Sequence, residues 1–158
     1  MDAEIETYSH QIRSLLERIG ACLAPLSQAQ LNWRPSHEGA NSAYVIAAHV
    51  LGNARAWVLG IACGEPVRRD RPAEFRAAGS YRELEAQARR LAEEIEEALE
   101  DLPASSLGRR FVPLQELWGE GVAHEISVRE ALLHVVEHAS IHLGQIQITR
   151  DLALEIGP

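Results

Sequence analysis

Three histidines recur at intervals of four residues in the C-terminal part of the chain: His134, His138 and His142. On an α-helix, four residues advance about 400°, so these side chains lie near one face with roughly 40° of drift per step. The same face carries Leu133, Ile141 and Ile148, and is therefore predicted to point inward. Buried imidazoles are costly unless each has a partner. A metal ion is the simplest common partner, because neutral imidazole is a standard ligand for zinc and nickel.

Helix geometry limits how many of these histidines can share one ion. About 12 Å of helix rise separates His134 from His142, whereas a metal–nitrogen bond measures about 2.1 Å. Only one adjacent pair can therefore chelate, and a third ligand must come from another helix. The spacing leaves two pairs open, His134 with His138 or His138 with His142.

Four segments with helical spacing of apolar residues surround this motif, at about 2–24, 42–60, 80–102 and 127–154. The third and fourth open with the capping-box patterns Ser80-Tyr-Arg-Glu83 and Ser127-Val-Arg-Glu130. Four amphipathic helices in a small chain predict an all-α four-helix bundle. Residues 64–79 form a long charged connection, which favours a crossover between helices two and three. Residues 104–126 read as a loop with one extended hairpin.

Metal sites in helix bundles are built from side chains on facing helices. His49 lies within the apolar surface of the second helix, whereas His10 is flanked by polar residues and His124 precedes the fourth helix in a loop. His49 is therefore the best candidate for the third ligand. Gln145, in the same C-terminal segment, is expected to hydrogen-bond a ligand imidazole.

Composition narrows the classes of function. The 158 residues are enough for one domain, which we expect to span 1–158, and a net charge of −8 without a dense basic patch argues against nucleic-acid binding. The N-terminus lacks a signal-peptide pattern, and no apolar run approaches the roughly 20 residues that span a bilayer. Cys22 and Cys63 form no CxxC motif, which fits a reducing cytoplasm.

Two segments of the sequence resemble the DinB-like superfamily of metal-binding four-helix bundles, which includes thiol-dependent transferases and maleylpyruvate isomerase. One is Leu31-Asn-Trp-Arg-Pro35 followed by Ser42 to Trp57, with His49 inside it. The other is Leu133 to Gln145, which is similar to the family's HxxxH ending before Gly-Gln. The order and spacing of the four helices agree as well, so the resemblance covers nearly the whole chain.

This resemblance implies His49, His138 and His142 as the ligands of one divalent ion, zinc or nickel. His134 then becomes a pocket-lining residue or a partner of a ligand, together with Gln145. The resemblance also implies up-down-down-up topology and a homodimer.

Three neutral histidines leave a coordination position open on the ion, which is typical of catalytic sites. The leading hypothesis is an enzyme resembling thiol S-transferases, which activates a low-molecular-weight thiol for transfer to, or isomerisation of, a small electrophilic substrate. The resemblance supplies the thiol. The alternatives are a hydrolase that uses bound hydroxide and a non-catalytic metal-binding stress-response protein. No catalytic residue is predicted.

Overall fold

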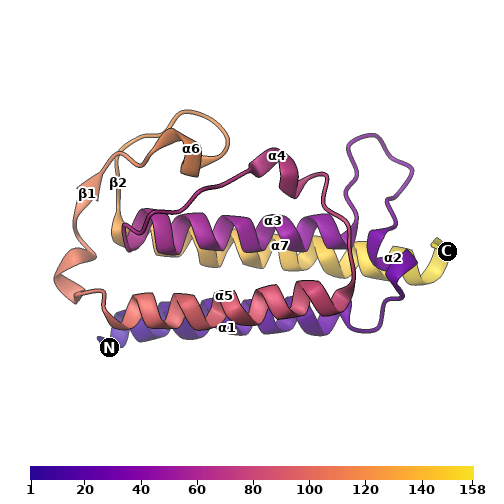
Figure 1. Cartoon of the computed structure of the whole chain (residues 1–158), viewed down its shortest axis with the longest axis horizontal. Coiled ribbons are helices and arrows are strands. Elements are labelled where there is room, and N and C mark those ends of the chain that lie inside the picture. Colours follow the sequence, from indigo (N-terminus) through magenta and orange to yellow (C-terminus); the bar gives the residue numbers. More distant parts are fainter.

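Four long helical segments lie alongside one another in the computed structural model, which describes all 158 residues (Figure 1). They are α1 (Ala3–Leu23), α3 (Ala43–Ala54) continued by η1 (Arg55–Ala62), α5 (Tyr81–Glu100) and α7 (Val128–Ile156). α1 and α7 run in one direction and α3 and α5 in the other (Figure 1). The chain is mostly helical, which confirms the predicted all-α class.

Shorter elements occupy the connections: α2 (Gln28–Asn32), α4 (Arg71–Glu74), η2 (Ala104–Ser106), β1 (Arg110–Phe111), α6 (Gln115–Trp118) and β2 (Ile126–Ser127). β1 and β2 pair antiparallel, with Phe111 opposite Ile126, so the loop before α7 does contain a short extended pair. The connection between η1 and α5 returns along α3 and packs α4 against it (Figure 1). This return lays α4 over the helix that carries His49.

Side-chain caps start the long helices where the sequence places them. Ser80 and Ser127 each accept a hydrogen bond from the backbone three residues on, and Glu83 and Glu130 reciprocate. The second helix departs from expectation, because its regular α-helical part ends at Ala54 and residues 55–62 form a π-helix. A π-helix changes the direction of the side chains that follow, and such segments occur frequently at functional sites.

The core is one cluster of 38 buried residues drawn from all four long segments. On α7 it uses a stripe that includes Leu132, Val135 and Ile146, all at most 1% exposed. The prediction that the face with Leu133, Ile141 and Ile148 points inward was wrong, since these side chains are 49%, 57% and 66% exposed. α7 carries large apolar side chains outside the buried stripe as well, so hydrophobicity alone does not select that stripe. His134, His138 and His142 lie between the buried stripe and the exposed apolar side chains, and they face α3.

The second long helix bears on the expectation that no segment of the chain could span a membrane. By length and composition, the helix Ala43–Ala62 could cross a membrane, so the expectation that no such segment exists was wrong. However, 78% of its most apolar 18-residue stretch is buried inside the protein. Burial of this kind is expected for a core helix.

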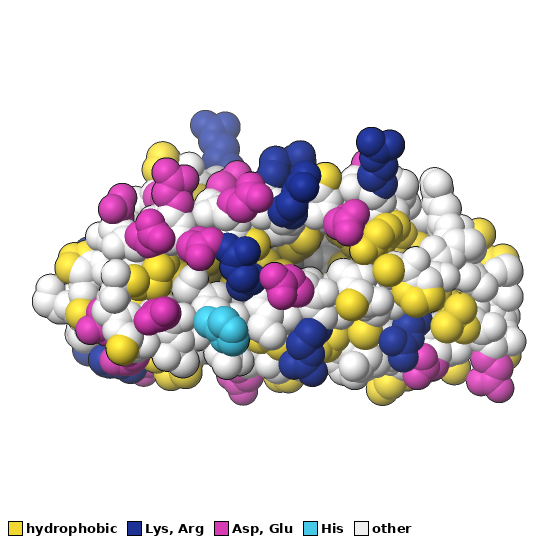
Figure 2. Space-filling view, turned by 90° about the horizontal axis from the view of Figure 1, so that it is seen from below, with side chains coloured by type: hydrophobic (Ala, Val, Ile, Leu, Met, Phe, Trp, Pro, Cys, Tyr) yellow, Lys and Arg dark blue, Asp and Glu magenta, His cyan; other side chains and the backbone are white.

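On the face seen in Figure 2, acidic and basic side chains intermingle, and Arg13 of α1 pairs with Glu96 of α5. Arginines thus pair with two of the acidic side chains of α5, Glu94 and Glu96.

Candidate metal centre

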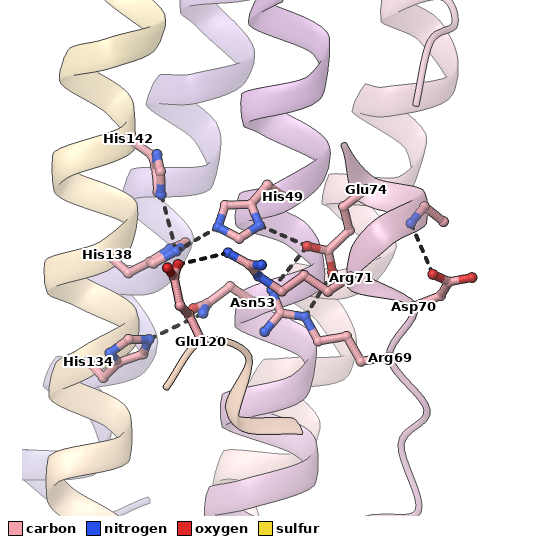
Figure 3. A network of polar contacts seen from close by, with 11 residues as sticks. His49, Asn53, Arg69, Asp70, Arg71, Glu74, Glu120, His134, His138 and His142 are labelled. Carbon is pink, nitrogen blue, oxygen red and sulfur yellow. Dashed lines mark hydrogen bonds and ion pairs between the residues drawn. The ribbon is translucent and has the colours of Figure 1, made fainter. Parts of the chain in front are cut away.

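Three imidazole nitrogens from two helices converge at one point. His138 Nε2 lies 3.1 Å from His49 Nε2 and 3.2 Å from His142 Nε2 (Figure 3). The three potential ligand atoms all lie within 4.8 Å of one another. Tetrahedral coordination with bonds of about 2.1 Å would separate its nitrogens by roughly 3.4 Å. The structure thus brings together His49, His138 and His142, in an arrangement that needs little adjustment to hold an ion.

Hydrogen bonds to the far side of two rings fix their tautomers. His49 Nδ1 donates to Glu74 Oε2 at 2.8 Å, and His142 Nδ1 donates to Gln145 Oε1 at 2.6 Å. Because Nδ1 carries the proton in both rings, both Nε2 lone pairs point to the centre of the cluster. Only His138 has a proton to offer them, and its own Nδ1 is buried without a partner. The centre has more acceptors than donors, so it fits a cation.

Burial favours the neutral form of His138 and His142. Desolvation lowers the pKa of His138 to about 2, and the neighbouring imidazoles lower it further in the same direction. Desolvation also lowers the pKa of His142, although its hydrogen bond to Gln145 acts the other way. A neutral imidazole is the form that binds metal. The rings of His138 and His142 therefore need no net loss of a proton to coordinate an ion near neutral pH.

Glu74 is the most important residue of the site that the sequence reasoning missed. It lies on α4 and binds His49 on one side and Arg69 on the other, whose Nε and Nη2 donate at 2.8 and 3.0 Å. Burial raises the pKa of Glu74, but the hydrogen bonds from His49 and Arg69 outweigh burial and hold it below the ordinary value. A carboxylate behind a ligand imidazole fixes its orientation and raises its basicity.

A local sequence signal does mark this short helix. Asp70 caps α4 by accepting a hydrogen bond from Ala73 N at 2.9 Å, and Pro72 stands in its first turn. Asp-x-Pro is a helix start, which could have identified α4 inside the predicted connection. Nothing in the sequence shows that α4 returns over His49. Gly52 makes the approach possible, because a Cβ there would lie 2.1 Å from Glu74 Oε1.

His134 lies outside the triad, in the wall of the adjacent cavity. Its ring stacks on Trp57 with centroids 3.7 Å apart, and its Nε2 lies 3.2 Å from Asn53 Nδ2. Burial lowers its pKa to about 4, helped by the charge of Arg69. This is the place expected for a pocket-lining residue. Asn53 was not singled out from the sequence, although it lies one turn after His49.

A cavity of about 610 Å³ opens over the triad. Its walls come from α3 and η1, α4, α6 with the segment after it, and α7. Its apolar lining is mainly aromatic, from Trp57, Phe75 and Trp118. Trp57 and Trp118 contact each other with centroids 5.0 Å apart. A small molecule in this cavity would lie against both the aromatic wall and the triad.

Comparison with known proteins agrees with this architecture. The sequence model of the DinB superfamily matches residues 11–146, a range that contains the triad, Glu74 and the whole cavity lining. No curated protein matches the chain. The match covers far more than half of the sequence, and the chain therefore belongs to the DinB superfamily.

Proposed function

We propose that the protein binds one divalent ion, zinc or nickel, through His49, His138 and His142, within an up-down-down-up four-helix bundle. The observation that carries the proposal is the convergence of three Nε2 atoms, two of them with tautomers fixed by Glu74 and Gln145. Catalytic metal sites commonly have three protein ligands and one open position. All three histidines line the same cavity, where a ligand could reach such a position.

We further propose that the protein is an enzyme that joins a low-molecular-weight thiol to a small electrophile, or isomerises the electrophile through that thiol. A divalent ion held by neutral ligands would supply the charge that lowers the pKa of a coordinated thiol. The side chains that line the cavity shape the space in which this reaction would take place. Trp57 and Trp118 give this space an apolar wall, and His134 adds a neutral ring to that wall at pH 7.

The test combines metal analysis of freshly purified protein with a screen of thiols against small electrophiles. The test variant is His138→Ala, which removes a proposed ligand. Its matched control is His10→Ala, because His10 lies exposed on α1. Electrophile loss that requires the thiol and His138 supports the proposal. Loss in buffer alone would instead assign a hydrolase, and stoichiometric metal without any turnover would assign a non-catalytic metal-binding protein.

We also propose that the chain acts in the cytoplasm as a homodimer, without nucleic-acid or membrane partners. The exposed side chains of Leu133, Ile141 and Ile148 along α7 support the dimer, because they give a second copy an apolar surface to cover. Sedimentation of the wild type and an Ile148→Lys variant tests it. A monomeric wild type would contradict the dimer.

A further inference from the structure

A second cleft, of about 390 Å³, adjoins the ion pair that holds His49. Its walls come from α3, η1, the connection that carries α4, and α5. Arg69 lines both this cleft and the cavity over the triad, and Glu74 lines the cleft. In Figure 3 these two residues lie on the side of His49 away from α7. The Arg69–Glu74 pair therefore forms part of the partition between the two spaces.

The lining of this cleft is positive, in a chain whose net charge is −8. Four arginines line it together with two carboxylates: Arg55, Arg68, Arg69 and Arg90, with Asp70 and Glu74. Both carboxylates already have partners inside the protein. Asp70 accepts a hydrogen bond from Ala73 N, and Glu74 binds His49 and Arg69. Neither carboxylate pairs with the three remaining arginines.

These three arginines are available to a ligand. Arg68 and Arg90 are exposed and form no ion pair. Arg55 pairs with Glu94 of α5, but the two side chains are 43% and 45% exposed. Exposed ion pairs are weak, so Arg55 can turn to an anion at little cost. Like charges around one cleft also repel one another, and a bound anion relieves that repulsion.

The rest of the lining is mostly apolar. It consists of two leucines and three alanines beside one amide: Leu51, Leu91, Ala48, Ala73 and Ala77, with Gln87. Leu51 lies on α3 and Leu91 on α5, so the apolar surface continues from one helix to the other. An inorganic ion would leave this surface uncovered, whereas the organic part of a larger anion would cover it.

We infer that this cleft binds a phosphate monoester, with its phosphoryl group among Arg55, Arg68 and Arg90 and its organic group against the leucines and alanines. A phosphate monoester carries close to two negative charges near pH 7 and three strong acceptor oxygens. Guanidinium forks match such oxygens. A carboxylate has one charge, which a single fork satisfies, so arginines from three different segments favour the phosphoryl group. The cleft has the size of a small-molecule site.

The experiment is calorimetric titration of the purified full chain with phenyl phosphate, inorganic phosphate and phenol. Phenyl phosphate should bind most tightly, inorganic phosphate more weakly, and phenol not at all. Arg68→Gln and Arg90→Gln should each weaken phenyl phosphate by about tenfold or more, because each removes a charge-assisted contact. Both side chains are exposed, so neither variant should lose helical circular dichroism. The matched control is Arg89→Gln, which changes the neighbouring arginine of α5, outside the cleft, and should bind as the wild type does.

A further variant, His138→Ala, separates this inference from the proposed metal site, since a phosphate can also bind a metal ion. Binding that persists in His138→Ala and falls in Arg68→Gln and Arg90→Gln supports the cleft, whether or not the protein holds a metal. Loss in His138→Ala without change in the arginine variants would overturn the inference and leave the metal site standing. Equal weakening by Arg89→Gln would also overturn it, because the effect would then be one of net charge. So would inorganic phosphate binding as tightly as phenyl phosphate, or no binding of phenyl phosphate at millimolar concentration.

Discussion

Glu74 Oε2 accepts a hydrogen bond from His49 Nδ1 at 2.8 Å, although the two residues belong to different elements and lie 25 positions apart. The carboxylate is 10% exposed and is held in turn by Arg69. A residue of the connection therefore sets the tautomer of a residue on the core helix. This contact links the path of the chain after η1 to the chemistry of the centre.

Replacing Glu74 should weaken metal binding without removing a ligand. For Glu74→Gln we expect affinity to fall by about 10–100-fold, because the imidazole loses its charged orienting partner. The change also leaves Arg69 buried without a counterion, which costs about 3–5 kcal/mol of stability. Chelator competition measures the affinity. The double variant with Arg69→Met should recover stability but not affinity, and Glu94→Gln, in an exposed pair with Arg55, should affect neither.

Gly52→Ala should act on the same contact from the opposite side. The new methyl group would lie 2.1 Å from Glu74 Oε1, so the carboxylate must move away from His49. We expect weaker metal binding, measured by chelator competition, in a protein that keeps its helical circular dichroism. The control is Gly20→Ala on α1, where nothing lies within 4 Å; it should stabilise the protein by roughly 0.5–1 kcal/mol. Unchanged affinity in Gly52→Ala would remove Glu74 from the site.

Single alanine variants should show which pair of histidines on α7 binds the ion, His134 with His138 or His138 with His142. Helix spacing alone left both pairs open. His49→Ala, His138→Ala and His142→Ala should each abolish stoichiometric metal, because each ring contributes one converging nitrogen. His134→Ala should retain it, since that ring packs on Trp57 instead. Metal analysis by mass spectrometry reads the result. Retained metal in His142→Ala with loss in His134→Ala would shift the site one turn along α7.

Metal removal should leave the fold intact. The cluster of 38 buried residues supplies the core without help from the centre, unlike a zinc finger whose fold depends on its ion. Chelated protein should therefore keep its helical circular dichroism at room temperature. Its melting temperature should fall, because an ion that binds only the folded state stabilises that state. Loss of helicity on chelation would make the ion structural.

Metal-free protein should lose stability on mild acidification. Burial lowers the pKa of His134 to about 4, whereas the unfolded chain takes up this proton near the ordinary value of about 6.5. Between these values the unfolded state binds more protons, so the free energy of unfolding falls as pH falls through that window. Urea unfolding at several pH values measures the slope. His134→Phe keeps a ring against Trp57 and should make the slope shallower, while the lowered pKa values of His138 and His142 preserve part of it. An equally steep slope in that variant would exclude His134 as a contributor.

The sequence by itself determined the class of the fold and the chemical character of the centre. Helical spacing with serine caps at Ser80 and Ser127 fixed where long helices begin, because capping depends on local backbone geometry. The four-residue spacing of His138 and His142 required a shared face, and the apolar surroundings of His49 identified it as a candidate. These inferences depend on contacts within one helix, or on composition.

Only the tertiary structure decided which stripe of α7 is buried and which residues stand behind the ligands. Leu133 and Ile141 are as apolar as the core, so their exposure follows from how α7 packs on its neighbours and not from their type. Glu74 and Arg69 reach His49 because the connection returns over α3. Packing between distant segments sets the path of a connection. The spacing of residues along the sequence does not predict that path.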